Sequence, residues 1–208
     1  MLREMATRYG RSPGGYLWAL LEPVGYIAVM SMAFSLILNE PLIGNNFPLF
    51  FATGFLPFML FTNSANMVGR SINFSRALLL YPAVNWVDAT LARFILNALT
   101  DTLVMVILFA AIILFTDDRT LLNLPTITLA IALGAALGLG IGVFNCALFG
   151  LFSAWMQIWG IITRPLFLAS GIFFIYDDLP KAAQDILWYN PLMHVVGVMR
   201  QGFYPTYK

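Results

Sequence analysis

Five apolar runs, each long enough to cross a lipid bilayer, constrain the fold of this sequence more than any other feature. They cover about residues 16–38, 47–68, 94–115, 126–148 and 155–176. A helix rises about 1.5 Å per residue, so each run matches a hydrocarbon core of about 30 Å. Within lipid a helix satisfies all its own backbone polar groups. The sequence therefore predicts an all-α polytopic membrane protein that forms a single transmembrane domain over residues 1–208.

Composition supports this prediction and excludes other classes. Hydrophobic residues make up 60% of the chain and charged residues only 10%, whereas about a quarter of the residues of a soluble globule are charged. The net charge of +1 provides no basic field, so we expect no nucleic-acid partner. The single cysteine, Cys146, excludes an internal disulfide and a metal site built from several cysteines.

Residues 1–12 have the pattern of a helix that lies on a membrane surface. Two sets of side chains divide this helix: Leu2, Met5, Ala6 and Tyr9 on an apolar face, and Arg3, Arg8 and Arg11 on a basic one. A secretory signal peptide is the alternative, because it too joins a basic segment to an apolar one. The following run is longer than a usual signal core of about 7–15 residues, and it leads into further spans, so we favour the interfacial helix.

Basic residues near the span ends predict the topology. One side collects Arg3, Arg8, Arg11, Arg70, Arg76 and Arg93, and the other collects Arg119, Lys181, Arg200 and Lys208. Basic residues favour the cytoplasm, so we expect a cytoplasmic N-terminus, a cytoplasmic connection at residues 69–93 and an outer C-terminal stretch. The turn after the fourth run contains no basic residue, so the side of the membrane on which it lies follows only from the number of spans that precede it.

Three ionisable residues fall at comparable depth inside the apolar runs: Glu22, Asp101 and Arg164. A charge at membrane depth costs at least about 2.5–3.5 kcal/mol unless it is paired or hydrated. We therefore expect Arg164 either to pair with Glu22 or Asp101, or to line a water-filled path beside them. Arg93, Asn97 and Asp101 recur every four residues, which predicts the inward face of the third run.

Aromatic residues are abundant, and most are expected in interface belts or facing lipid. A flat ring also offers a surface on which a sugar can slide without being held tightly. Tyr26, Trp159 and Phe167 are the candidates for such stacking.

The fourth run bears a ridge of small residues every four positions: Ala130, Gly134, Gly138, Gly142, Cys146 and Gly150. Such a ridge lets another helix approach to backbone contact. We interpret it as a packing surface.

The tail contains two short helical segments separated by breaks. Residues 177–180 form the first break, and Asn190 with Pro191 forms the second. Neither segment can span, so residues 177–200 are expected to form a re-entrant hairpin in the outer leaflet, which includes Trp188 and Arg200. His194 is the only histidine, and we expect it to pack rather than to bind a metal.

Short motifs along the whole chain match one family. In chain order they are Leu2-Arg3-Glu4-Met5, Thr7-Arg8-Tyr9-Gly10, Gly15-Tyr16-Leu17-Trp18, Leu21-Glu22-Pro23, then Leu79, Leu80, Pro82, Val84 and residues 88–93, then Arg164-Pro165 and residues 188–194. This ordered set resembles the permease subunit of type-2 ABC exporters, most closely the capsule polysaccharide export permeases.

The resemblance implies a homodimeric permease in a bacterial inner membrane that docks on a separate ABC ATPase subunit. The sequence has no GxxxxGK[ST] loop, so the chain would bind no cofactor and the partner would use ATP and Mg²⁺. The ATPase would contact the 69–93 segment, at Leu79, Leu80, Pro82, Val84 and Asp88. The hairpin of residues 177–200 would cap the exit for a polysaccharide or glycolipid.

The resemblance further implies periplasmic and outer-membrane export components as partners. It also implies a sixth span after Lys208, where this sequence stops. Two other functions stay open. A type-2 permease for a lipid, a drug or another glycoconjugate would share the fold. A membrane-embedded enzyme would need a convergent acid–base or metal cluster, and the acidic residues here are scattered.

Overall fold

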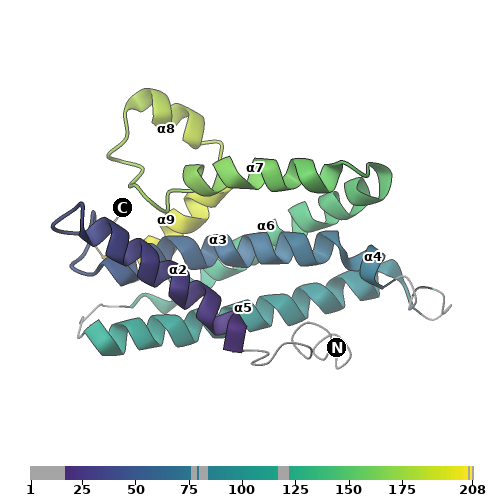
Figure 1. The fold of residues 1–208 in the computed structure, drawn as a ribbon, viewed down its shortest axis with the longest axis horizontal. Helices are drawn as coiled ribbons and strands as arrows, with labels where there is room; N and C mark the ends of the chain where they lie inside the picture. The colour runs from purple at the N-terminus through teal and green to yellow at the C-terminus, as the bar shows by residue number, and fades with distance from the viewer. Residues whose placement is uncertain (1–16, 76–78, 80–83, 117–121, 206, 208) are drawn as a thin grey trace.

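The computed structural model describes residues 17–75, 79, 84–116, 122–205 and 207, and over these residues the chain is helical with no strand. The helices are α2 (Leu17–Ser35), α3 (Phe47–Gly69), α4 (Ser71–Phe74), α5 (Trp86–Thr116), α6 (Leu124–Leu151), α7 (Trp155–Ala169), α8 (Lys181–Leu187) and α9 (Pro191–Phe203) (Figure 1). The predicted all-α fold is confirmed. The interfacial helix expected over residues 1–12, with Arg3, Arg8 and Arg11, lies outside the described residues, as do Leu80 and Pro82.

Among the described helices, α2, α3, α5 and α6 are long and apolar enough to cross a membrane. The fifth run is different, because α7 ends at Ala169 instead of near residue 176. Its 15 residues extend only about 22 Å, so the predicted length of this span is wrong. The chain turns at Gly171, whose φ of +79° is a left-handed conformation that side chains disfavour. The sixth span stays a prediction.

Asparagine and proline set the start of several helices. Asn123 accepts a hydrogen bond from the Thr126 backbone N–H at 3.4 Å before α6, and Asn190 accepts one from the Leu192 N–H at 3.1 Å before α9. Proline at the first or second position follows in both helices and also in α3. An asparagine cap satisfies a free N–H, and proline there loses no hydrogen bond.

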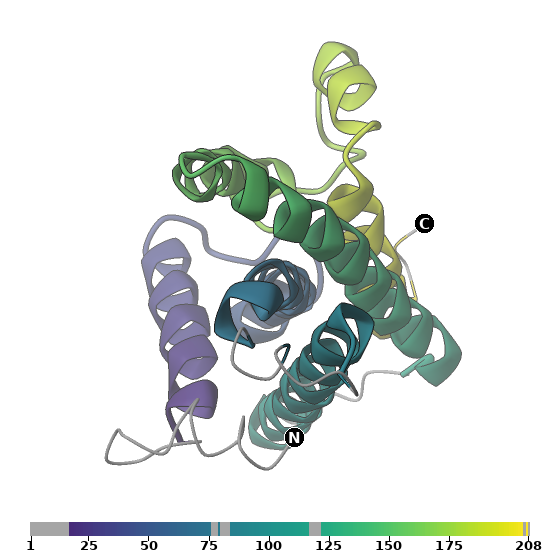
Figure 2. The ribbon, with the colours of Figure 1, turned by 90° about the vertical axis from the view of Figure 1, so that its right-hand side faces the viewer.

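Helix α3 is the centre of the fold, with α2, α5, α6 and α7 around it (Figure 2). In its spanning window 67% of the residues are buried, against 28% in α5 and in α6 and 17% in α2. Fully buried side chains such as Leu49, Leu56 and Leu60 point from α3 into the core. The outer helices leave apolar side chains exposed, as a lipid solvent allows.

The ridge of small residues on α6 packs against α3. A Cβ added at Gly138 would lie 2.6 Å from the Ser64 Cβ, and one at Gly142 would lie 2.6 Å from the Val68 Cβ. These distances leave no room for a side chain, so the packing interpretation is confirmed there. Gly150 lies beyond this contact, since a Cβ there would meet nothing within 4 Å.

Successive long helices run in opposite directions, which gives the bundle two ends (Figure 1). At one end the Ser71 Oγ lies 3.7 Å from the Cys146 Sγ, so the turn between α6 and α7 is beside α4. At the other end the Asn123 N–H donates to the Gly202 carbonyl at 2.9 Å, so the tail is beside the start of α6. The α6–α7 turn therefore lies at the same end as α4, and the tail lies at the opposite end, as the alternation of successive spans predicts. The assignment of the α4 end to the cytoplasm stays a prediction.

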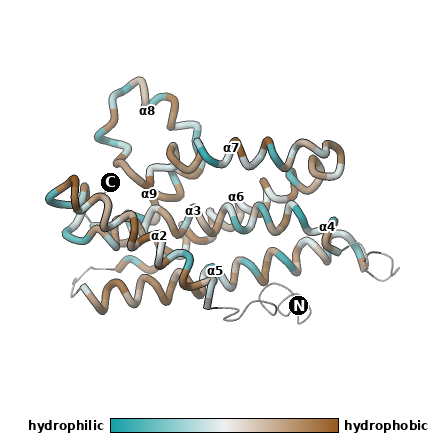
Figure 3. Tube along the Cα trace, in the orientation of Figure 1, coloured by the Kyte–Doolittle hydropathy of each residue, from teal (hydrophilic) through white to brown (hydrophobic). Residues whose placement is uncertain are grey.

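Polar positions are concentrated in two places. Hydrophilic colour marks the half of α5 nearer α4 and recurs along α7, while the far half of α5 is hydrophobic (Figure 3). These two polar zones contain Asp101 and Arg164, two of the three charges that the sequence places at membrane depth, whereas Glu22 lies on α2.

Candidate functional site

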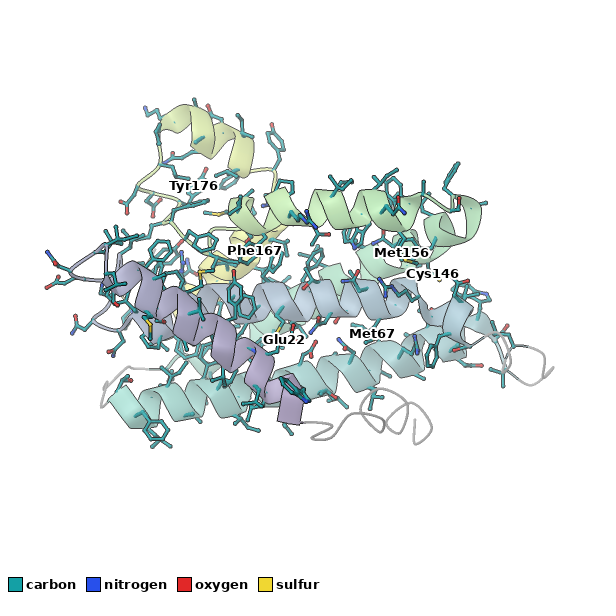
Figure 4. The ribbon with its side chains drawn as sticks, in the orientation of Figure 1. Glu22, Met67, Cys146, Met156, Phe167 and Tyr176 are labelled. Carbon is teal, nitrogen blue, oxygen red and sulfur yellow. The ribbon has the colours of Figure 1, made fainter. Side chains whose placement is uncertain are left out.

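A groove of about 600 Å³ runs between α3 and α7. Its polar and aromatic lining comes from both helices: Asn66, Arg70, Trp159, Thr163, Arg164 and Phe167. In Figure 4, Met156 and Phe167 mark the two ends of this lining along α7. Arg164, Trp159 and Phe167 were each singled out from the sequence, and the structure brings all three together.

Two contacts fix the width of the groove. The Trp159 indole N–H donates a hydrogen bond to the Asn66 side-chain oxygen at 3.0 Å. About two turns away, the Phe58 and Phe167 ring centroids lie 5.1 Å apart. Residue numbers rise along α7 from Trp159 to Phe167 as they fall along α3 from Asn66 to Phe58, so the two helices are antiparallel. The two contacts hold them together at two levels, and between these contacts the side chains leave open space.

The groove is cationic. Arg70 lies one turn beyond Asn66, and Arg164 lies on the other side of the Asn66–Trp159 bond. None of the described residues that line the groove bears a carboxylate. The remaining wall is largely apolar, with Phe58, Phe167 and others, and a weakly polar wall strengthens the attraction of a guanidinium for an anion.

The ion pair expected for Arg164 is not formed with Glu22 or with Asp101, among the described residues. Tyr26, one turn after Glu22, has its ring 5.8 Å from that of Phe167, yet Glu22 is exposed on α2 and does not line the groove. Asp101 is buried against α3, where its carboxylate accepts a hydrogen bond from Asn97. Local hydrogen bonding holds this carboxylate on α5, so only the path-lining alternative for Arg164 stays open.

The polar residues of α5 face inward, as their spacing predicts. Asn97 and Asp101 are 1% and 4% exposed. The Asn97 amide donates to Asp101 Oδ2 at 2.9 Å and to the Ser64 Oγ at 3.3 Å, which joins α5 to α3. Arg93 lies one turn earlier, with its guanidinium 3.9 Å from the centre of the Phe74 ring on α4.

The third stacking candidate, Tyr26, is part of an aromatic cluster beside the groove. Its ring stacks on Phe55 at 4.0 Å and meets Phe167 edge-on at 5.8 Å. Tyr26 does not itself line the groove. Tyr26 therefore supports Phe167 from outside the groove, whereas Trp159 and Phe167 line the groove itself.

The 69–93 segment is tied to the bundle at its start and its end. The Ser71 hydroxyl lies 3.1 Å from the Thr90 hydroxyl on α5, and 3.7 Å from the Cys146 Sγ on α6. Asp88 accepts a hydrogen bond from the Asn85 N–H at 3.0 Å, which caps the start of α5. Leu79 and Val84 are half-buried. A force on this segment would reach α5 and α6 through these contacts.

The hairpin after α7 consists of α8 and α9, with the break at Asn190 and Pro191 where the sequence predicts it. The Asn190 amide donates to the Ala169 carbonyl at 2.9 Å and so ties α9 to the end of α7. The His194 ring nitrogen lies 2.8 Å from the Trp188 carbonyl oxygen, a contact that fits a packing role.

Arg200 anchors the same hairpin from within the protein. It is completely buried and donates to the Phe174 and Ile172 carbonyls at 2.8 and 3.1 Å. Its guanidinium also lies 4.4 Å from the centre of the Phe50 ring on α3. Burial lowers the pKa of Arg200, and the neighbouring Tyr207 acts in the opposite direction. The sequence places Arg200 in the outer-leaflet hairpin but does not reveal these contacts.

Residues 1–204 match the ABC-2 type transporter family. The chain belongs to this family.

Curated relatives of this ABC-2 chain are similar over nearly all of its length. The Polysialic acid transport protein KpsM of Escherichia coli is 30% identical over 99% of the chain and 80% of its own length. The Capsule polysaccharide export inner-membrane protein CtrC of Neisseria meningitidis serogroup B is 27% identical over 98% of the chain and 77% of its own length. BexB of Haemophilus influenzae, which has the same descriptive name, is also 27% identical, with the same two coverages.

Family membership confirms the resemblance seen in the motifs and makes this ABC-2 chain a transporter subunit. In the part of the chain that the structure describes, no three His, Cys, Asp or Glu side chains are grouped to hold a metal ion. Sequence reasoning missed Asn66, Arg70 and Thr163 as groove residues. Of these three, only Arg70 has a signal in the sequence. It is a basic residue near the end of a span, and the topology prediction uses it.

Proposed function

We propose that this chain is the permease subunit of an ATP-driven exporter that moves surface polysaccharide, carried on a lipid, out across a bacterial inner membrane. Two copies of the chain would form the channel, with the N-terminus in the cytoplasm. Support comes from its relatives, which include capsule polysaccharide export inner-membrane proteins. The observation that supports this function best is the α3–α7 groove, where aromatic rings and two arginines, which make no ion pair among the described residues, line an otherwise apolar bundle.

The groove would form one wall of the polysaccharide path in each copy. Trp159 and Phe167 would present ring faces to the apolar faces of passing sugars. Asn66 fixes the Trp159 ring by its hydrogen bond, so the stacking surface is held in place before a sugar arrives. Arg164, which makes no ion pair among the described residues, would face water and cargo in the path.

Energy would come from a separate ABC ATPase, which binds ATP and Mg²⁺ and docks on the 69–93 segment. The contacts of Ser71 with Thr90 and Cys146 would transmit its movement to α5 and α6. The cation–π contact of Arg93 with Phe74 would keep α4 against α5 during this movement. The carboxylate of Asp101 and the amide of Asn97 would hold α5 against α3.

The hairpin of residues 177–200 would cap the exit, where the periplasmic and outer-membrane components of the export system would receive the polysaccharide. Asn190 and Arg200 anchor this hairpin to α7 and α3. Trp188 and Tyr189 remain exposed on it, at 59% and 86%, and are available to a passing chain or a partner.

A type-2 permease for another cargo is the second candidate. The apolar part of the groove wall, including Phe58 and Leu168, would also accommodate an acyl chain or a drug. This candidate predicts an exporter whose transport does not depend on a sugar chain.

The test is co-expression of the permease, with any genomic extension, with its neighbouring ATPase in a strain that makes the polysaccharide. We expect a stable complex whose ATP hydrolysis responds to the permease, and polysaccharide at the cell surface. Arg164→Leu and Trp159→Ala should impair export and leave ATPase binding intact. Phe115→Ala is the matched control, since Phe115 is 90% exposed at the end of α5. Normal export by Arg164→Leu would remove this arginine from the mechanism, and failure to bind the ATPase would refute the proposed function.

A further inference from the structure

A pocket of about 290 Å³ lies in the hairpin after α7, at the end of the bundle opposite α4. It shares no lining residue with the α3–α7 groove. Its walls come from the loop before α8, where Figure 4 shows Tyr176 beneath that helix, and from α9 with the residues around it. Its polar and aromatic lining consists of Tyr176, Asp177, Trp188, His194, Gln201 and Tyr207. The hairpin therefore contains a candidate binding site that is separate from the groove.

This hairpin pocket and the groove differ in charge. The described lining of the pocket contains one carboxylate, Asp177, and neither arginine nor lysine. Arg200 is nearby, but it is completely buried and its guanidinium donates to backbone carbonyls. Burial raises the pKa of Tyr207, Arg200 offsets part of this rise, and the negative charge of Asp177 adds to it. The exposed carboxylate of Asp177 forms no ion pair with a described residue, so it is available to a cation in the pocket.

Aromatic rings form much of the remaining wall. The centroids of the Tyr176 and Trp188 rings lie 6.2 Å apart, and the two rings are tilted by 48°. The Trp188 and His194 rings are perpendicular, with centroids 4.8 Å apart. The face of an aromatic ring is negative and attracts a cation, and several rings together form the cages by which proteins bind ammonium groups. Rings beside a carboxylate therefore indicate a cationic ligand.

The walls of the pocket are held in place before any ligand binds. The Gln184 side-chain amide, on α8, donates to the Tyr176 carbonyl at 3.1 Å and to the Asp177 carbonyl at 3.3 Å. The Tyr176 hydroxyl donates in return to the Gln184 carbonyl at 3.2 Å. A contact of 2.8 Å between the His194 ring nitrogen and the Trp188 carbonyl oxygen keeps Trp188 against α9. A site that is already ordered loses less entropy when it binds.

The size and position of the pocket favour a lipid headgroup as the source of the cation. Ligand pockets measure about 300–1,000 Å³, so this small pocket admits a headgroup but not a whole lipid. Ile186 and Trp188, on the same hairpin, are 75% and 59% exposed, as suits a segment at the membrane–water interface. The Gln201 amide oxygen is a second acceptor beside the Asp177 carboxylate. Two acceptors suit a primary ammonium, because a quaternary one has no N–H to donate.

We propose that this pocket binds the primary ammonium group of a lipid headgroup, as in phosphatidylethanolamine, between the Asp177 carboxylate and the rings of Tyr176 and Trp188. The phosphate and the acyl chains of the lipid would lie outside the pocket, along the exposed side of α8. In the proposed topology the bound lipid would fasten the hairpin to the outer leaflet. The inference concerns the hairpin alone and holds for any cargo of the permease.

The test uses the permease–ATPase complex in micelles of a non-ionic detergent. The micelles contain equal amounts of phosphatidylethanolamine, phosphatidylcholine and phosphatidylglycerol with identical acyl chains, and native mass spectrometry counts the lipids that the complex retains. We expect phosphatidylethanolamine to be retained at least about tenfold over phosphatidylglycerol, because charge-assisted hydrogen bonds and cation–π contacts act only on the ammonium. Phosphatidylcholine should fall between them, since it keeps the positive charge but has no N–H.

Variants assign this preference to the pocket. Asp177→Asn keeps the shape of the side chain and removes its charge, so the ratio of phosphatidylethanolamine to phosphatidylglycerol should fall about tenfold. Asp185→Asn is the matched control, because Asp185 is an exposed carboxylate on α8 outside the lining. Trp188→Leu should lower the ratio about fivefold. Tyr189→Leu removes the adjacent ring, which is outside the lining, and should leave the ratio unchanged. Recovery of the intact complex in the same spectra shows that each variant is folded.

Three results would overturn the inference. Equal retention of the three lipids would show that the pocket does not distinguish headgroups. A preference for phosphatidylethanolamine that persists in both Asp177→Asn and Trp188→Leu would place the lipid elsewhere on the protein. Loss of the preference when free ethanolamine or a lysine tripeptide is added at the concentration of the lipid would assign the pocket to a soluble amine or to a lysine of a protein partner.

Discussion

Helix α3 presents two contrasting faces, one closed against α6 and one open toward α7. On the closed face, glycines of α6 bring two backbones into contact at Ser64 and Val68. On the open face, Trp159 and Phe167 hold α7 away from α3 at two levels. The comparison shows that residue size decides which helix pair packs closely and which leaves a groove between its helices.

The same contrast applies to two arginines. Arg200 is completely buried, with two backbone carbonyls and the Phe50 ring as partners. Arg164 is exposed in a groove and makes no ion pair among the described residues. Arg200 therefore contributes to structure, whereas the cationic site of Arg164 is available for binding. Three changes would break or sharpen these two comparisons.

The largest effect is expected at the closed face. Gly142→Val would place a Cβ 2.6 Å from the Val68 Cβ and 3.2 Å from the Ala65 Cα, so the helices would have to separate. Overpacking of this kind costs about 1–3 kcal/mol or more. We expect a lower free energy of unfolding in mixed detergent micelles and poor recovery of the complex.

Gly140→Val is the matched control for that change, since a Cβ at Gly140 meets nothing within 4 Å. Both variants place the same β-branched residue in the same helix. Equal stability of the two proteins would contradict the view that the α3–α6 contact is the rigid core.

A smaller loss is expected when the buried arginine is replaced. Arg200→Met keeps a long apolar side chain but leaves the Phe174 and Ile172 carbonyls without their donor. An unsatisfied buried acceptor costs about 1–3 kcal/mol, and relief from burying a charge offsets part of this. We expect reduced stability and earlier proteolysis of residues 170–190, measured by limited digestion.

Lys at this position provides the control, because it keeps the charge and can reach only part of the same acceptors. We expect Arg200→Lys to fall between the native protein and Arg200→Met. If the Arg200→Met variant were as stable as the native protein, the hairpin would have to be anchored by Asn190 and its neighbours instead.

Much of this architecture could be predicted from the sequence. Hydropathy located the four spanning helices, spacing identified the inward face of α5 at Asn97 and Asp101, and Asn190 with Pro191 marked the hairpin break. Each of these depends on residues that are close together in the chain, where helical periodicity and proline chemistry act directly.

The features that the sequence did not reveal depend on distant contacts. The end of α7 was misplaced because Phe173, Phe174 and Ile175 continue the apolar composition past the turn at Gly171. The groove needs Asn66 and Trp159, which are 93 residues apart, and no local pattern pairs them. Arg200 resembles any outer-side charge until Phe50 and the 172–174 carbonyls surround it.

The smallest effect is expected at the hydrogen bond between Asn66 on α3 and Trp159 on α7. Asn66→Ala and Trp159→Phe each remove one partner of a single hydrogen bond, and a double-mutant cycle isolates their coupling. Side-chain hydrogen bonds between membrane helices contribute about 0.6 kcal/mol on average, so we expect a coupling of that order. If the coupling were zero while transport still fell in both single variants, Asn66 and Trp159 would act separately on the cargo. A measurable coupling together with a common transport defect would show that the hydrogen bond sets the width of the groove.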